Sequence, residues 1–151
     1  MKTRDGGKES LVDADTLARL RDFFSRERAV AAAYLFGSQA EGNPRPDSDV
    51  DIAVIFSKNL GTEEAFWERV RLLGRLEDLL QPRKVDVVDL ERVPPLLAHE
   101  ILRSPVLLCE HDPDRRIVVE AGRQAEYLDF VPRLQYYRRE VLGLEGPGTC
   151  P

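Results

Sequence analysis

The sequence predicts a single α/β domain in which helices flank a small mixed sheet. Short apolar runs of strand type alternate along the chain with longer amphipathic stretches of helical period. No repeat, low-complexity segment or linker divides the 151 residues, a length at which one domain can bury most of its apolar surface. We expect a flexible leader over 1–12, the domain over 13–143 and a disordered tail over 144–151.

The first half of the chain is expected to form a helix and two strands. An aspartate, Asp13 or Asp15, caps the helix, which should run to about Arg28. The run 29–36 has no polar face, as is typical of a strand buried on both sides. The run 49–56 alternates and is rich in β-branched residues, so we expect a second strand that pairs with the first. The connection between them could return either way, so the strand directions stay open.

A long helix and a third strand follow. The range 62–80 is amphipathic, and we expect Thr62 to cap this helix. Its apolar residues repeat at intervals of three and four and predict a buried face made of Phe66, Val70, Leu73, Leu76 and Leu80. The alternating run 84–90 predicts the third strand.

The last third adds two helices and a short strand. Prolines in the first turn indicate a short helix over 94–103, and the run 106–110 predicts a fourth strand. Asp112 should cap a final helix that Pro132 interrupts and that ends near Gly143.

The composition disfavours several classes of protein. With a net charge of −5, the chain lacks the excess of basic residues that binding of a long nucleic acid usually requires. No apolar run approaches the ~20 residues of a membrane span, and residues 1–10 have no signal-peptide core, so we expect a cytoplasmic protein. Two cysteines make no disulfide framework. We expect Cys109 to be a small buried hydrophobe and Cys150 to be free.

Two acids stand at the start of the second strand. Asp49 and Asp51 are two residues apart, so on a strand they share a face with Cα atoms ~6.6 Å apart. Their carboxylates repel each other, and this pattern costs stability unless a cation lies between them. Mg²⁺ is the natural candidate, since it takes hard oxygen ligands and often combines one or two carboxylates with substrate phosphates. Both aspartates are therefore predicted metal ligands.

Gly37 and Ser38 close the first strand and are the candidate nucleotide-binding residues. A glycine lets the backbone approach a ligand, and a short helical turn over 38–41 would present N–H groups and a hydroxyl to a phosphate. The phosphate-binding residues Gly37 and Ser38 and the two metal-binding aspartates are separated by one loop, which predicts a site for a nucleoside triphosphate and a metal. Arg45 in that loop is expected to be solvated.

A third acid is expected from the third strand, because phosphoryl-type transfers often use two metals ~3.5–4 Å apart or one metal and a base. Asp86 and Asp89 are the candidates. They lie three residues apart, so they face opposite sides of the strand. We favour Asp86, since an acid in mid-strand is harder to explain structurally than one at the strand end, and Asp89 remains the alternative.

Other conspicuous residues have structural explanations. For His99 and His111, surface or capping roles are expected. Tyr136 and Tyr137, followed by two arginines, could form a patch that faces a partner, but amphipathic packing plus a solvated face is the favoured interpretation.

The motif residues resemble the signature of the nucleotidyltransferase superfamily related to DNA polymerase β, in which Gly-Ser is followed after ten residues by Asp-x-Asp. The stretch is more closely similar to the minimal nucleotidyltransferase (MNT) family, whose pattern is matched by Gly37, Ser38, Ala40, Gly42, Ser48, Asp49 and Asp51. The third strand and the final helix also look like those of MNT antitoxins, so the resemblance spans about residues 14–142.

The resemblance implies a fold, a partner and a reaction. MNT proteins are often antitoxins encoded beside a helical HEPN-domain ribonuclease toxin, and some adenylylate a tyrosine of that toxin with ATP and Mg²⁺. By this resemblance, Gly37 and Ser38 would hold the triphosphate, and Asp49 and Asp51 would bind the metals, expected to be two ions. Asp86 would ligate a metal and promote attack by the acceptor hydroxyl. The metals would neutralise charge that develops on the α-phosphate and on the leaving pyrophosphate.

Two other functions stay open besides transfer of AMP to a toxin. A small-molecule nucleotidyltransferase, such as one that modifies an aminoglycoside, usually needs a second domain for its acceptor pocket, although a dimer could supply the missing wall. A non-catalytic antitoxin would act by contact alone, for which clustered carboxylates have no use. A template-directed polymerase is excluded by the small size and the sign of the net charge. Nothing in the sequence selects ATP over GTP or CTP.

Overall fold

The computed structural model describes residues 14–37 and 49–144. The helices and strands are α1 (Ala14–Ser25), β1 (Val30–Phe36), β2 (Val50–Phe56), α2 (Thr62–Leu80), β3 (Val85–Asp89), α3 (Pro95–Arg103), β4 (Val106–Glu110), α4 (Pro113–Tyr136) and the π-helical turn η3 (Tyr137–Val141). The expectations for the leader, the turn over 38–41, Arg45, Cys150 and the tail beyond Leu144 lie outside the described residues.

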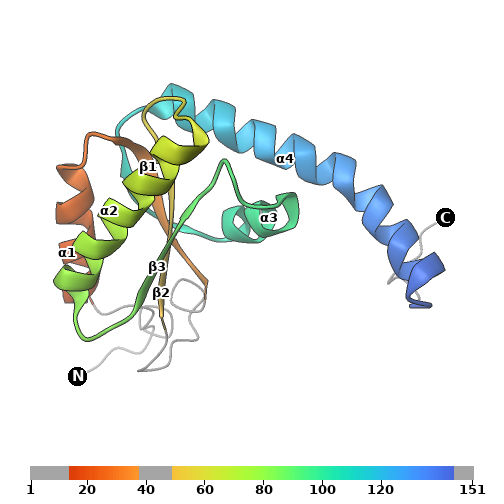
Figure 1. Cartoon of the computed structure of the whole chain (residues 1–151), viewed down its shortest axis with the longest axis horizontal. Helices are drawn as coiled ribbons and strands as arrows, with labels where there is room; N and C mark the ends of the chain where they lie inside the picture. Colours follow the sequence, from red (N-terminus) through yellow and green to blue (C-terminus); the bar gives the residue numbers. More distant parts are fainter. Residues whose placement is uncertain (1–13, 38–48, 145–151) are drawn as a thin grey trace, which may run out of the picture.

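The four strands form one mixed sheet in the order β3-β2-β1-β4 (Figure 1). β1 is antiparallel to both β2 and β4, whereas β2 and β3 are parallel. A parallel pair needs a crossover connection, and the nineteen-residue α2 supplies it. The predicted α/β class with a small mixed sheet is confirmed, and the strand directions that the sequence left open are settled.

Helices cover both faces of the sheet. One face packs against α1 and α2 in a core that includes Leu20, Phe24, Ile52, Val54, Leu72 and Leu76. The opposite face packs against α3 and the first half of α4 in a second core that includes Ala53, Ile55, Ala98, Ile101 and Val119. Successive residues of β2 therefore enter different cores, which explains why β1 and β2 are apolar on both sides.

The predicted N-cap and buried face of α2 need correction. Gly61 is the N-cap, and its N–H donates to Glu64 Oε1 at 3.1 Å, so Thr62 is the first helical residue. The buried residues are Ala65, Leu72, Leu76 and Leu80, whereas Phe66 and Val70 are exposed. Apolar residues lie on two adjacent stripes of this helix, and the position of the sheet decides which stripe is covered.

The last helix differs from its prediction at Pro132. Asp112 caps α4 as expected, because its Oδ1 accepts the N–H of Arg115 at 3.1 Å. The helix then continues through Pro132 without interruption and runs on as η3. A proline on an exposed helix is tolerated where water can bind the carbonyl that it leaves unpaired. The second half of α4 extends well beyond the sheet (Figure 1). None of the helices in the described ranges is long and apolar enough to cross a bilayer.

Candidate active site

The sheet brings Asp51 and Asp86 together. Each is the second residue of its strand, and the two are register partners in the parallel β2–β3 pair. Asp51 lies on the same face as Ala53, and Asp86 lies on the same face as Val88; both of those residues belong to the core on the α3 side. Asp49 precedes β2 by one residue and is exposed. Three of the predicted site residues thus gather where β2 and β3 begin.

The electrostatics of this acid cluster are unfavourable in the absence of a counter-charge. The pKa of Asp51 is raised from 3.8 to about 6, first by burial and then by the nearby charges of Asp86 and Asp49, in that order of importance. Asp51 is half-buried, whereas Asp86 and Asp49 are exposed. Asp51, which the charges of its two neighbours repel, is therefore also the least hydrated of the three carboxylates.

Gly37 is packed directly against this cluster. A Cβ at Gly37 would lie 2.5 Å from Asp51 Oδ2, closer than real Cβ atoms come to their neighbours, and the residue has φ +81°. Both the left-handed backbone and the missing side chain therefore require glycine here. The sequence assigned Gly37 to nucleotide binding, and the structure adds that it gives the Asp51 carboxylate its space. Ser38, the other predicted nucleotide-binding residue, lies outside the described residues.

The two candidate acids of β3 have different environments. Asp89 is 5% exposed and faces the α2 side of the sheet. Its Oδ1 accepts the N–H of Glu91 at 2.9 Å, and its Oδ2 pairs with Arg92 at 3.1 Å. Asp89 therefore stabilises the turn that follows β3, and Asp86 is the acid that lies on the same face of the sheet as Asp51. This placement favours Asp86, whose catalytic role remains a prediction.

The chemistry of the acid cluster suits a divalent cation. The carboxylates of Asp51 and Asp86, with Asp49 nearby, supply hard oxygen ligands, and their mutual repulsion would be relieved by a bound cation. Across 14–37 and 49–144, no three His, Cys, Asp or Glu side chains form a ready-made metal-binding group. Asp49, Asp51 and Asp86 thus fit a metal by donor type, and the metal assignment remains a prediction.

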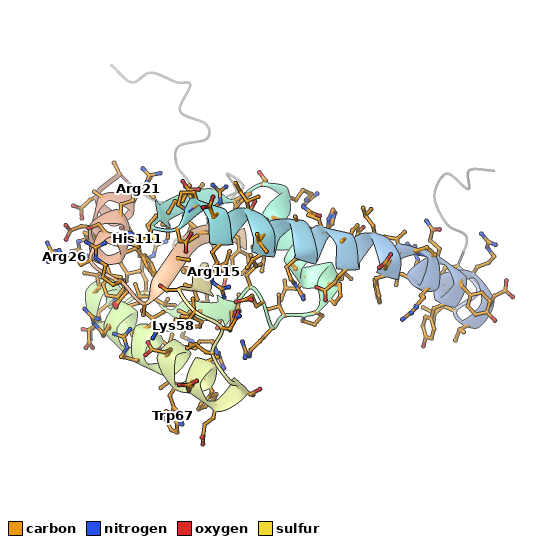
Figure 2. The ribbon with its side chains drawn as sticks, turned by 90° about the horizontal axis from the view of Figure 1, so that it is seen from above. Arg21, Arg26, Lys58, Trp67, His111 and Arg115 are labelled. Carbon is orange, nitrogen blue, oxygen red and sulfur yellow. The ribbon has the colours of Figure 1, made fainter. Side chains whose placement is uncertain are left out.

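Arg115 is a positioning residue to which the sequence analysis gave no structural role. Its Nε donates to Phe56 O at 2.5 Å, at the end of β2, and its Nη2 pairs with Glu91 Oε1 at 2.6 Å, just after β3. Figure 2 shows Arg115 directed from α4 toward the loop of Lys58, whose carbonyl also accepts a hydrogen bond from Nη2. This mostly buried guanidinium ties together the far ends of the two strands that carry Asp51 and Asp86. No local sequence pattern distinguishes it from the neighbouring arginine.

His111 has a role of the expected kind at the end of α1, whereas His99, expected at the surface or in a cap, packs between α3 and α4. His111 Nε2 lies 2.8 Å from Phe24 O, and the ring of His99 stacks on Tyr127 with centroids 3.7 Å apart. Cys109 is half-buried and free, and burial raises the pKa of its thiol to about 11.

Comparisons with known proteins agree on one class of enzyme. A family model described as polymerase beta, nucleotidyltransferase matches residues 18–114. A protein of Methanocaldococcus jannaschii, named as a protein adenylyltransferase, is 35% identical over 80 residues, which cover 53% of this chain and 81% of that protein.

Solved structures are similar in fold. A chain of the MntA–HepT toxin–antitoxin complex matches with a TM-score of 0.53 and 17% identity, covering 87% of this chain and 97% of that one. A toxin–antitoxin structure with AMP-PNP gives a TM-score of 0.55 and 21% identity over the same shares. A complex of tri-AMPylated HEPN toxin with MNT antitoxin from Shewanella oneidensis gives 0.53 and 18% identity, covering 85% and 96%. At these identities the likeness shows the fold.

Proposed function

The chain belongs to the polymerase beta nucleotidyltransferase family, and on that premise we propose that it transfers AMP from ATP to a tyrosine hydroxyl of a HEPN-domain toxin. The observation that carries this proposal is the in-register pair Asp51 and Asp86, which share one face of the sheet where β2 and β3 begin. Neither acid is paired with a base among the ion pairs of the described residues, whereas the structural acid Asp89 is. A metal–triphosphate site accounts for such an arrangement.

The proposed reaction gives each residue a role. The acceptor oxygen attacks the α-phosphorus, a new O–P bond forms, the bond to the bridging oxygen breaks, and pyrophosphate leaves with its electron pair. Asp86 takes the proton of the acceptor hydroxyl, because it is the exposed acid beside Asp51. Gly37 keeps the Asp51 carboxylate in place and, with Ser38, holds the triphosphate.

Asp49, Asp51 and Asp86 are the residues that would hold Mg²⁺. When bound there, the metal would neutralise charge on the α-phosphate and on the leaving pyrophosphate. The carboxylates supply the negative charge and the oxygen ligands for it, and the packed β2 behind Asp51 holds that carboxylate rigidly.

A protein acceptor is favoured over a small molecule by two comparisons. The archaeal relative, of which this chain covers 81%, is named as a protein adenylyltransferase. One structural neighbour contains a HEPN toxin that is described as AMPylated. A small-molecule nucleotidyltransferase and an antitoxin that acts by binding alone are the competing functions.

A labelling experiment tests the proposal. The full chain is incubated with ATP labelled at the α-phosphate, Mg²⁺ and the HEPN-domain protein encoded by the adjacent gene, and mass spectrometry locates the label. We expect the label on a tyrosine of that protein and none with Asp51→Asn. Label on a small molecule instead would favour the second function. Neutralisation of the toxin by Asp51→Asn without label would favour the third.

A further inference from the structure

The far end of the last helix carries an apolar surface that the domain does not cover. Past α3, the second half of α4 and the turn η3 extend away from the sheet (Figure 1). Tyr136, Tyr137, Val141 and Leu142 are all at least half exposed there. The two tyrosines were expected to combine amphipathic packing with a solvated face, and in the structure both are largely exposed. Large apolar side chains on a projecting helix indicate a contact surface.

Two of these side chains, Tyr137 and Val141, continue a stripe of α4 that packs against the domain in the first half of the helix. In the first half of α4, Val119 is buried in the core on the α3 side, and Tyr127 stacks on His99. From Tyr127 onward, apolar residues follow at intervals of three and four: Phe130, Leu134, Tyr137 and Val141. We call these four residues the α4 stripe. An apolar stripe of this period is the seam by which one helix packs against another.

The charges beside the stripe define the partner further. From residue 133 to 144 the chain has three arginines (Arg133, Arg138 and Arg139) and a single acid, Glu140, although the whole chain has a net charge of −5. A two-fold contact between two copies of this segment would bring the arginines of both copies together, which is unfavourable. The charge pattern therefore favours a different protein with carboxylates beside its apolar seam.

The position of the stripe relative to the acids suggests which protein this is. Asp51 and Asp86 point to the side of the sheet that α3 and α4 cover, so α4 projects from the same side as the acids. We propose that the α4 stripe docks a helix of the acceptor protein, which presents an apolar seam flanked by carboxylates. This inference rests on the proposed function. A protein held there lies on the side of the domain where its hydroxyl has to reach the acids.

Substitutions in the full chain test the docking surface. Val141→Asp and Tyr137→Ala change exposed residues of the stripe, and titration calorimetry measures binding of the HEPN-domain protein encoded by the adjacent gene. We expect each variant to weaken binding by about tenfold or more, as for an apolar interface anchor. Binding of AMP-PNP should not change, because both residues are remote from the acid cluster.

Matched controls separate this surface from any exposed apolar residue. Leu128→Asp changes a residue of α4 that is 68% exposed but lies off the stripe, against 57% for Val141. Trp67→Ala changes an exposed aromatic residue on α2, far from the end of α4 (Figure 2). We expect both to alter the affinity by less than about threefold.

The outcomes distinguish the inference from the proposed function. If the stripe variants bind like the unaltered chain, or if Val141→Asp dissociates a homodimer in light scattering, the docking inference is wrong while labelling of the toxin can still stand. If the unaltered chain binds the HEPN-domain protein but never labels it, the proposed function is wrong while the surface can still stand. If the adjacent gene encodes no HEPN-domain protein, or the two do not bind, both are wrong.

Discussion

Replacing Asp51 by asparagine should stabilise the protein in the absence of metal, by an amount that depends on pH. Folding raises the pKa of this carboxyl from 3.8 to about 6, first by burial and then through Asp86 and Asp49. The folded state therefore holds the proton more tightly than the unfolded state. Below pH 3.8 the carboxyl is protonated in both the folded and the unfolded state, so it does not lower the free energy of unfolding. As the pH rises from 3.8 to about 6 the cost grows, and above 6 it is fully present.

The size of this effect follows from the two pKa values. The difference between 3.8 and about 6 corresponds to about 3 kcal/mol. Because Asp51 is only partly buried, water screens the interactions, and we expect about 1 to 2 kcal/mol. Asp51→Asn should raise the free energy of unfolding by that amount at pH 7.5 and by nothing at pH 3.5.

Urea denaturation with EDTA, at pH 7.5, 5 and 3.5, measures this difference. Asp86→Asn is the companion variant, since it removes one of the charges that raise the pKa of Asp51. It should also raise the free energy of unfolding, over the same pH range. With Mg²⁺ added at pH 7.5, only the unaltered chain should gain stability. An Asp51→Asn chain that is less stable than the unaltered one at pH 7.5, or equally stable at all three pH values, would refute the reasoning.

Three more substitutions test the surroundings of the site. Gly37→Ala should cost about 2 kcal/mol of stability and most of the transferase activity, because the methyl group would displace the Asp51 carboxylate; unchanged activity contradicts the role given to this glycine. Asp89→Asn should cost about 1 to 2 kcal/mol in thermal unfolding, because it removes the ion pair of a buried carboxylate with Arg92, which is partly exposed and keeps its hydrogen bond to Leu60 O, whereas Asp86→Asn should leave the melting temperature unchanged or raised; the reverse order would interchange the two acids. Arg115→Met should cost about 2 to 4 kcal/mol in denaturant unfolding by releasing the far ends of β2 and β3; a loss below about 1 kcal/mol would show that these bonds are dispensable.

Local patterns were sufficient for the strands and for the motif. The apolar runs predicted β1, β2 and β4 to within one residue at each end, because a strand buried on both sides leaves no choice of polar face. The Asp112 cap was predicted because a capping side chain bonds to residues close to it in the sequence, although the same reasoning placed the cap of α2 at Thr62 instead of Gly61. The resemblance of the Gly-Ser and Asp-x-Asp motif to a known family signature likewise indicated the class of enzyme before any contact between distant residues was considered.

Only the tertiary structure decided which distant residues meet. Asp86 and Asp89 differ little in sequence, and it is the parallel register of β2 with β3 that places Asp86 beside Asp51 and turns Asp89 toward Arg92. The position of the sheet likewise chose the buried stripe of α2, and the extent of the domain left the end of α4 uncovered. Sequence periodicity shows which residues share a face, but what that face meets depends on long-range packing, which no local pattern contains.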